Sequence, residues 1–355
     1  MVIEPNARIL WIRTDRLGET ILNLPAVAGL KRALPEARIT FVCRPEWAPL
    51  IQRAPEVDRV LTVTENAGWW IGRAIRLAIR LRPERFDLAV ISNPKKEWHL
   101  ATWLAGICCR VGYDRKWGFL LTHRVPDHKA LGERHEVEYH AQLASAAGLS
   151  VSTPPWRFPP FQHEQAEVQQ VLERHGVPIQ TPLLAVHPWT SNPSKRWPME
   201  RFRRLLEDLS QQFEGLSVVV IGGPQEQGVG RALLTPPIPR VVNLIGLLSI
   251  TQLAALLETA WLLISNDSGP VHLAAAVGTR TVVLFGVTSP AMSPKRWGPW
   301  GDIHTVISKR SLEEIPVDEV LRAVEWHLKK QQTADSTQPT GNSSAVARDE
   351  AKDRQ

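Results

Sequence analysis

Three short segments hold residues whose types and spacing suit chemistry, and each follows an apolar run and leads into a helical pattern. They are residues 14–20 (TDRLGET), 187–198 (HPWTSNPSKRWP) and 265–276 (SNDSGPVHLAAA). A turn between a strand and a helix lies at the carboxyl edge of a parallel sheet, which is where ligands bind in such sheets. These segments are therefore the candidates for a catalytic base and for an anion-binding site.

The first segment contains two carboxylates, Asp15 and Glu19, on either side of Gly18. A carboxylate within reach of a hydroxyl can remove its proton, and Gly18 allows a close backbone approach. The alternative is an ordinary helix N-terminus, where the helix dipole favours acidic residues. The segment lacks the GxGxxG pattern, which counts against a nicotinamide-dependent enzyme.

The second segment suits a phosphate group. It combines the hydroxyls of Thr190 and Ser191, backbone N–H groups and the ammonium of Lys195 on one loop. The alternative is a surface loop that enters a helix with a proline near its start.

The third segment predicts an anion site at a helix N-terminus, preceded by the tight turn of Ser268 and Gly269. Asp267 can bind sugar hydroxyls, and His272 can supply positive charge or a hydrogen-bond donor near a phosphate. The alternative is a capped helix that contains a buried histidine satisfied by the backbone.

Other polar residues have simpler interpretations. Glu226 follows a glycine pair at the end of an apolar run, and it either holds ribose hydroxyls or belongs to a plain turn. The cysteines have neither the number nor the spacing of a disulfide framework or a metal pair, and we predict no metal site. They are Cys43, Cys108 and Cys109.

The elements that position these residues alternate between β-branched runs and helical patterns, which predicts parallel sheets with crossover helices. One helix is expected over residues 19–34 and another over residues 68–82. We predict two Rossmann-like, doubly wound α/β domains that face each other across a cleft. The expected parts are an N-terminal domain (1–153), a proline-rich linker (154–162), a C-terminal domain (163–315), a final helix (316–330) and a disordered tail (331–355).

The composition of the 355 residues, with 43% apolar and 22% charged side chains, is typical of a soluble globular protein. Lysine and arginine exceed the acidic residues by 42 to 36, a net charge of +6 without the long basic run of a nucleic-acid arm. We expect no nucleic-acid partner, no signal peptide and no membrane span. Arginines at positions 73, 76, 80 and 82 lie on one helical patch, which is either a contact for phosphorylated glycolipid or a solvated face.

Taken together, the chain resembles glycosyltransferase family 9, the ADP-heptose:lipopolysaccharide heptosyltransferases, over residues 7–330. Further matching segments are HEVEYHAQLASAAGL, GGPQE and NLIGLLSITQLAALLETAWLLISNDSGP. The resemblance implies a GT-B fold and an inverting, metal-independent transfer that needs no cofactor beyond ADP-heptose as the donor. It further implies a lipopolysaccharide-core glycolipid acceptor and a cytoplasmic monomer, in peripheral contact with the inner membrane.

The resemblance also implies roles for individual residues. Lys195 with Thr190 and Ser191 would bind phosphate and stabilise the leaving ADP, Glu226 would bind ribose, and Leu248 would line the adenine pocket. The sugar diphosphate would lie at Asp267, Ser268, Gly269 and His272. Where the family has Gly-Asp, with that aspartate as the base, this chain has Gly18-Glu19. We predict Glu19 as the base, with Asp15 as the rival.

Three other functions remain open from the sequence. The same type of enzyme can use a different nucleotide-sugar donor. A nucleotide-sugar epimerase shares the GT-B architecture but acts without an acceptor. A nucleotide-sugar-binding protein with little catalytic activity would be compatible with the change at Glu19.

Overall fold

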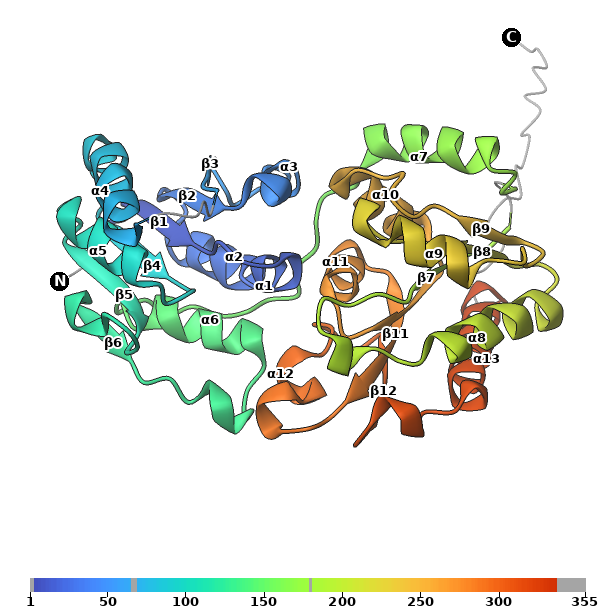
Figure 1. The fold of residues 1–355 in the computed structure, drawn as a ribbon. Helices are drawn as coiled ribbons and strands as arrows, with labels where there is room; N and C mark the ends of the chain where they lie inside the picture. Colours follow the sequence, from blue (N-terminus) through green and yellow to red (C-terminus); the bar gives the residue numbers. More distant parts are fainter. Residues whose placement is uncertain (1–2, 65–68, 179–180, 337–355) are drawn as a thin grey trace, which may run out of the picture.

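The computed structural model describes residues 3–64, 69–178 and 181–336 of the chain. None of the helices within these residues is both long and apolar enough to cross a bilayer. Two lobes lie side by side, each built around its own parallel sheet (Figure 1).

The N-terminal sheet has six parallel strands in the order β3-β2-β1-β4-β5-β6. Its central strands are almost entirely buried apolar residues, as expected for a parallel sheet covered by helices on both faces. The strands are β1 (Arg8–Ile12), β2 (Arg38–Cys43), β3 (Arg59–Thr62), β4 (Leu88–Ile91), β5 (Cys109–Tyr113) and β6 (His123–Val125).

The helices of this domain are α1 (Leu17–Ile21), α2 (Leu24–Ala33), α3 (Ala48–Ile51), α4 (Trp70–Leu81), α5 (Lys96–Leu104) and α6 (Glu136–Ser145). The single helix expected over residues 19–34 is wrong, because it is divided between α1 and α2. Pro25 has no N–H to continue the helix, and the Asn23 amide instead donates to the Glu19 carbonyl (2.6 Å). Asn23 also accepts from the Trp11 indole of β1 (2.9 Å). Two residues, Leu22 and Asn23, therefore separate the short helix α1 from α2.

The C-terminal sheet repeats the same strand order, read as β9-β8-β7-β10-β11-β12. In this doubly wound order the crevice lies where the direction of winding reverses, between the first and fourth strands. The strands are β7 (Leu183–His187), β8 (Ser217–Val220), β9 (Val241–Asn243), β10 (Leu262–Asn266), β11 (Arg280–Gly286) and β12 (Thr305–Lys309).

The helices of the C-terminal domain are α7 (Gln162–Arg174), α8 (Met199–Gln212), α9 (Gln227–Leu233), α10 (Ile250–Thr259), α11 (Gly269–Val277), α12 (Pro294–Trp297) and α13 (Val317–Ser336). The final helix, expected to end at residue 330, continues to Ser336, so the first residues of the expected tail are helical. The rest of that tail, residues 337–355, lies outside the described residues.

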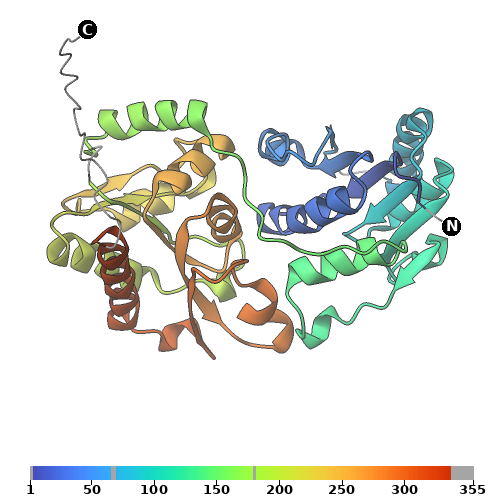
Figure 2. The same cartoon turned by 180° about the vertical axis from the view of Figure 1, so that it is seen from behind.

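Residues 149–161 connect the domains without a helix or strand, and Figure 2 shows this segment passing between the two lobes. It contacts both lobes. The Trp156 indole donates to Glu56 (3.1 Å) in the N-terminal domain, and the Phe158 N–H donates to the Ala276 carbonyl (2.8 Å) in the C-terminal domain.

Candidate active site

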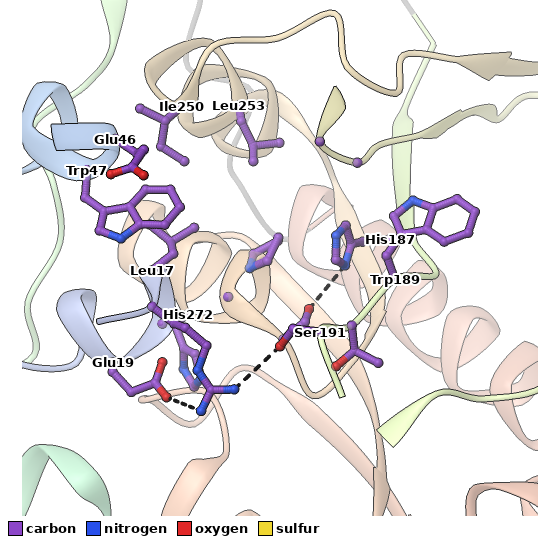
Figure 3. Close-up of a pocket in the computed structure, with 18 of the residues that line it drawn as sticks. Leu17, Glu19, Glu46, Trp47, His187, Trp189, Ser191, Ile250, Leu253 and His272 are labelled. Atoms are coloured by element: carbon purple, nitrogen blue, oxygen red, sulfur yellow. Dashed lines mark hydrogen bonds and ion pairs between the residues drawn. The ribbon is translucent and has the colours of Figure 1, made fainter. Parts of the chain in front are cut away.

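A cleft of about 1120 Å³ opens between the two domains, and both contribute side chains to it (Figure 3). The N-terminal domain supplies residues that follow β1 and β2. The C-terminal domain supplies residues that follow β7, β8, β10 and β11, together with the start of α10. The cleft thus lies at the carboxyl edges of both sheets, as their winding requires.

Helices α1 and α11 are in close contact at the cleft, and glycines make this approach possible. A Cβ on Gly18 would lie 2.5 Å from Cδ2 of His272, which is closer than atoms can pack. A Cβ on Gly269 would lie 3.2 Å from Cβ of Leu17 in the opposite helix. Both turns therefore need glycine for a tertiary reason that no local pattern reveals.

Glu19 lies in the first turn of α1 and faces the cleft (Figure 3). Its Oε1 is 2.8 Å from Nη2 of Arg16, and its side chain is 12% exposed. Nη1 of Arg16 is 3.5 Å from the Ser191 hydroxyl of the other domain. Arg16, to which the sequence analysis assigned no role, thus links the candidate base to the loop that follows β7.

Asp15, the rival base, does not line the cleft. Its Oδ1 accepts from Nε of Arg13 (2.7 Å) and its Oδ2 accepts from the Asn93 amide (3.1 Å). Because Arg13 is buried, the Asp15 carboxylate neutralises a charge inside the N-terminal domain. The two carboxylates of one turn therefore face different surroundings.

Lys195 and Asp267 are brought together from different strands of the C-terminal sheet and form a direct ion pair. Burial raises the pKa of the Asp267 carboxyl, and the neighbouring Lys195 ammonium opposes that rise. Lys195, predicted to bind phosphate, therefore lies next to Asp267, predicted to bind sugar hydroxyls. Both lie beside the N-terminus of α11.

Asn266, at the end of β10, holds both ends of the loop that contains Lys195. Its Oδ1 accepts from the Trp197 N–H (2.9 Å), and its Nδ2 donates to the Pro188 carbonyl (2.7 Å). The sequence analysis assigned no role to Asn266. Thr190 and Ser191 line the cleft from the same loop, where the Thr190 hydroxyl accepts from the Asn192 N–H (3.3 Å).

The N-terminus of α11 has no side-chain cap. The Ser268 hydroxyl instead lies 3.2 Å from Nδ1 of His187, whose pKa burial lowers to about 4. The capped helix that was the alternative interpretation is therefore not observed. The N–H groups of the first turn of α11 remain available to bind an anion.

His272 is buried at the start of α11, and its Nδ1 has no hydrogen-bond partner within the described residues. It is therefore not a histidine satisfied by the backbone. Burial lowers the pKa of His272 to about 3, so the ring is neutral near pH 7. A neutral ring favours the second of the two expected roles, a hydrogen-bonding group near a phosphate, over the supply of positive charge.

The far end of the cleft is apolar. Leu248 lines it with Ile250 and Leu253 of α10, and Trp47 of the N-terminal domain lies opposite (Figure 3). Trp47 was not predicted from the sequence, because no local signal distinguishes it from a packing residue. Such an apolar pocket suits the flat ring of a nucleobase.

Glu226 also lines the cleft, from a short 3₁₀ helix (Pro224–Glu226). A Cβ on Gly223 would lie 3.0 Å from its Oε2, so the carboxylate lies against the glycine. The neighbouring Gly222 accommodates Trp189, whose indole donates to the Ile221 carbonyl (3.0 Å).

Within the residues that the structure describes, no three histidine, cysteine, aspartate or glutamate side chains are grouped so that they could hold a metal ion. Cys43, Cys108 and Cys109 are all free thiols, of which only Cys108 is exposed.

Comparisons with known proteins identify a family and a fold for this chain. Residues 74–324 match the family profile described as glycosyltransferase family 9 (heptosyltransferase). Lipopolysaccharide heptosyltransferase 2 of Escherichia coli K12 is 28% identical over 81% of this chain and 85% of its own length. The fold is similar to that of a glycosyl transferase family 9 protein from Veillonella parvula, with a TM-score of 0.82 at 21% identity, covering 91% of this chain and 97% of that one. It is also similar to ADP-heptose lps heptosyltransferase II of E. coli, with a TM-score of 0.77 at 24% identity over 92% and 99% of the two chains.

Proposed function

The chain belongs to glycosyltransferase family 9 and is a glycosyltransferase of GT-B fold, and from this premise we propose that it transfers heptose from ADP-heptose to the lipopolysaccharide core. One observation carries the proposal. A carboxylate of one domain, Glu19, faces the uncapped N-terminus of α11 and the Lys195–Asp267 pair of the other domain across a single cleft.

The donor is proposed to lie along the C-terminal wall of the cleft. Its diphosphate would occupy the N-terminus of α11, where backbone N–H groups and the helix dipole favour negative charge. Lys195 would supply a further cation, and Thr190 and Ser191 would supply hydroxyl donors. The adenine would enter the apolar end at Leu248, which leaves Glu226 beside the ribose.

The proposed reaction is a single displacement. The acceptor hydroxyl attacks the anomeric carbon from the side opposite the diphosphate, and Glu19 takes the hydroxyl proton. The bond between the anomeric carbon and the phosphate oxygen breaks, and ADP leaves with the electron pair. Lys195 and the α11 N-terminus stabilise its charge, so the step requires no metal ion. Displacement from the opposite side inverts the anomeric configuration.

An anionic glycolipid is the proposed acceptor, because cations gather beside the turn that carries Glu19. Lys95 donates to the Thr14 carbonyl (3.3 Å), and Lys96 is its neighbour at the start of α5. The pKa of Lys116 is lowered by burial and by the charges of Arg115, Lys95 and Lys96. Phosphates on an acceptor would relieve this mutual repulsion of like charges.

We further propose that α4 contacts the cytoplasmic face of the inner membrane. The outer face of this helix carries Ile79, 67% exposed, with Arg76 and Arg80, and Trp69 directly before the helix is 69% exposed. Exposed apolar side chains interleaved with arginine are typical of helices that lie on anionic bilayers.

Replacing Ile79 and Arg76 by serine should reduce sedimentation with phosphatidylglycerol vesicles, and Val229→Ser on α9 should not. Equal sedimentation of all three proteins would argue against this surface.

The decisive experiment incubates the full-length protein with ADP-heptose and heptose-deficient core lipopolysaccharide. We expect a heptosylated product whose new linkage, observed by NMR, has the configuration opposite to that of the donor. Activity should persist in EDTA, and UDP- and GDP-sugars should not replace the donor. Transfer from one of those sugars, or isomerisation of the donor without transfer, would replace the proposal with one of its rivals.

A further inference from the structure

A buried carboxylate joins the two domains at the side of the cleft. Glu136 is the first residue of α6, and its side chain is 2% exposed. Its Oε1 accepts from Lys129 Nζ of the same domain (2.5 Å), and its Oε2 accepts from Arg296 Nε of the C-terminal domain (3.0 Å). None of the three residues belongs to the proposed donor or base machinery.

Arg296 belongs to α12 and lines the cleft. Its Nη1 donates to the Lys129 carbonyl (3.1 Å) and the Ala291 carbonyl (3.2 Å), and its guanidinium lies 4.7 Å from the centre of the Trp297 ring. Within the described residues its Nη2 has no hydrogen-bond partner. Protein groups thus hold the guanidinium through Nε and Nη1, and its Nη2 donors remain available to a ligand.

The charges of this cluster do not balance. Two cations, Lys129 and Arg296, share one carboxylate. Burial lowers the pKa of Lys129 to about 8, although Glu136 opposes the shift. A buried ion pair is seldom more stable than apolar packing of the same volume, so stability alone does not explain a cluster with an excess cation. An anion in the adjacent cleft would compensate the excess charge.

The position of Arg296 depends on how the domains meet, because two close contacts flank it. A Cβ on Gly132 would lie 2.0 Å from the Pro290 carbonyl oxygen of the other domain. Nε2 of His135 lies 2.8 Å from the Gly298 carbonyl oxygen. Arg296 therefore has its observed place only when these surfaces are in contact.

We propose that Arg296 binds the diphosphate of the nucleotide-sugar donor, and that Glu136 of the N-terminal domain is the positioning residue that places it. This inference rests on the proposed function, because it assumes an anionic donor in this cleft. It couples donor affinity to contact between the domains. A guanidinium held by a carboxylate presents its remaining donors in a fixed plane, which suits phosphate oxygens.

The test measures ADP and adenosine binding to full-length variants by calorimetry. Arg296→Gln should weaken ADP binding roughly ten- to hundredfold, because a charge-assisted hydrogen bond is lost, and should leave adenosine binding unchanged. Arg296→Lys, which keeps the charge and is the safer variant for folding, should recover part of the affinity. Glu136→Gln should also weaken ADP binding but not adenosine binding, and Glu136→Asp should restore some of it.

Arg203→Gln is the matched control. Arg203 also pairs with a carboxylate, Glu207 (2.9 Å), and donates to a carbonyl, Leu233 (2.8 Å), but it does not line the cleft. It should bind ADP as the wild type does.

Wild-type ADP affinity in both Arg296 variants would overturn the proposal. Equal weakening of ADP and adenosine binding would also overturn it, because it would indicate a purely structural role. If the wild type binds ADP but transfers no heptose, the proposed function fails while the role of Arg296 is still tested by ADP binding.

Discussion

At the scale of the residue, the partner of a side chain decides what that side chain can do. Asp15 and Glu19 stand four positions apart in one turn, and either is chemically able to act as a base. The Asp15 carboxylate is hydrogen-bonded by Arg13 and Asn93. Among the residues that the structure describes, the Glu19 carboxylate is paired with the exposed Arg16, and it faces the cleft. A base must reach the substrate hydroxyl directly or through one water, and only Glu19 has that access.

We therefore predict that Glu19→Gln lowers kcat by about 10²–10⁴-fold, the usual contribution of a general base, and leaves the KM for the donor nearly unchanged. Asp15→Asn should instead lower the melting temperature, because it leaves the buried Arg13 without its counter-charge. Steady-state kinetics and thermal denaturation of both variants distinguish the roles. Full activity of Glu19→Gln would eliminate Glu19 as the base.

At the scale of the element, the cleft depends on the close contact between α1 and α11. Asn23 and Pro25 lie where the expected helix is divided, and the first turn of α1 contacts α11. Gly18 then allows the two helices to approach until His272 occupies the space of the missing side chain. Gly18 therefore sets how closely the two domains can approach each other.

Gly18→Ala should therefore impair the enzyme without unfolding it. The added Cβ would lie 2.5 Å from the His272 ring, so we expect the domains to separate slightly. In small-angle scattering with saturating ADP, the radius of gyration should exceed that of the wild type, and kcat should fall.

Gly72→Ala is the control for this prediction, because Gly72 is also helical and the nearest atom to its missing Cβ is 3.7 Å away. It should gain up to about 1 kcal/mol of stability from helix propensity and keep full activity. An unchanged radius and rate in Gly18→Ala would show that α1 and α11 tolerate a wider spacing.

At the scale of the whole molecule, buried histidines connect stability to pH. Burial lowers the pKa to about 4 for His99, His187 and His327 and to about 3 for His272, from an ordinary value of 6.5. Between these values the unfolded chain binds more protons than the folded one. The stability contributed by the neutral rings is therefore complete above about pH 6.5 and is lost as the pH falls towards 4.

We predict that the free energy of unfolding decreases steeply between pH 6.5 and pH 4.5, by roughly 1 kcal/mol for each of these histidines per pH unit. Denaturant titrations across this range measure the slope. His99→Phe should make the slope shallower, because both ring nitrogens of the buried His99 have no partner within the described residues and an apolar ring replaces them. A slope that is flat, or unchanged in His99→Phe, would contradict this account.

Much of the architecture could be predicted from the sequence, because it depends on local patterns. Alternating apolar strands and helical runs indicated two doubly wound domains, and the segments after β1, β7 and β10 were identified as the edge of the cleft. Ten of the eleven residues proposed for the site line that cleft, and Asp15 is the exception. Strand ends place side chains at a sheet edge whatever lies opposite, so no tertiary information was needed.

The remaining features depend on which segments meet across the fold. Two of these features are ion pairs between residues far apart in the sequence, Lys195 with Asp267 and Arg296 with Glu136. The third, the neutral ring of His272, reflects burial in the assembled cleft. Charge, burial and hydrogen bonding are set by neighbours in space, and a linear pattern does not contain those neighbours. The sequence by itself determined which strand ends form the edge of the cleft, because that depends on local patterns. The packing of the two domains decided which further residues, such as Trp47 and Arg296, reach the cleft and which of the predicted ones are free to act there.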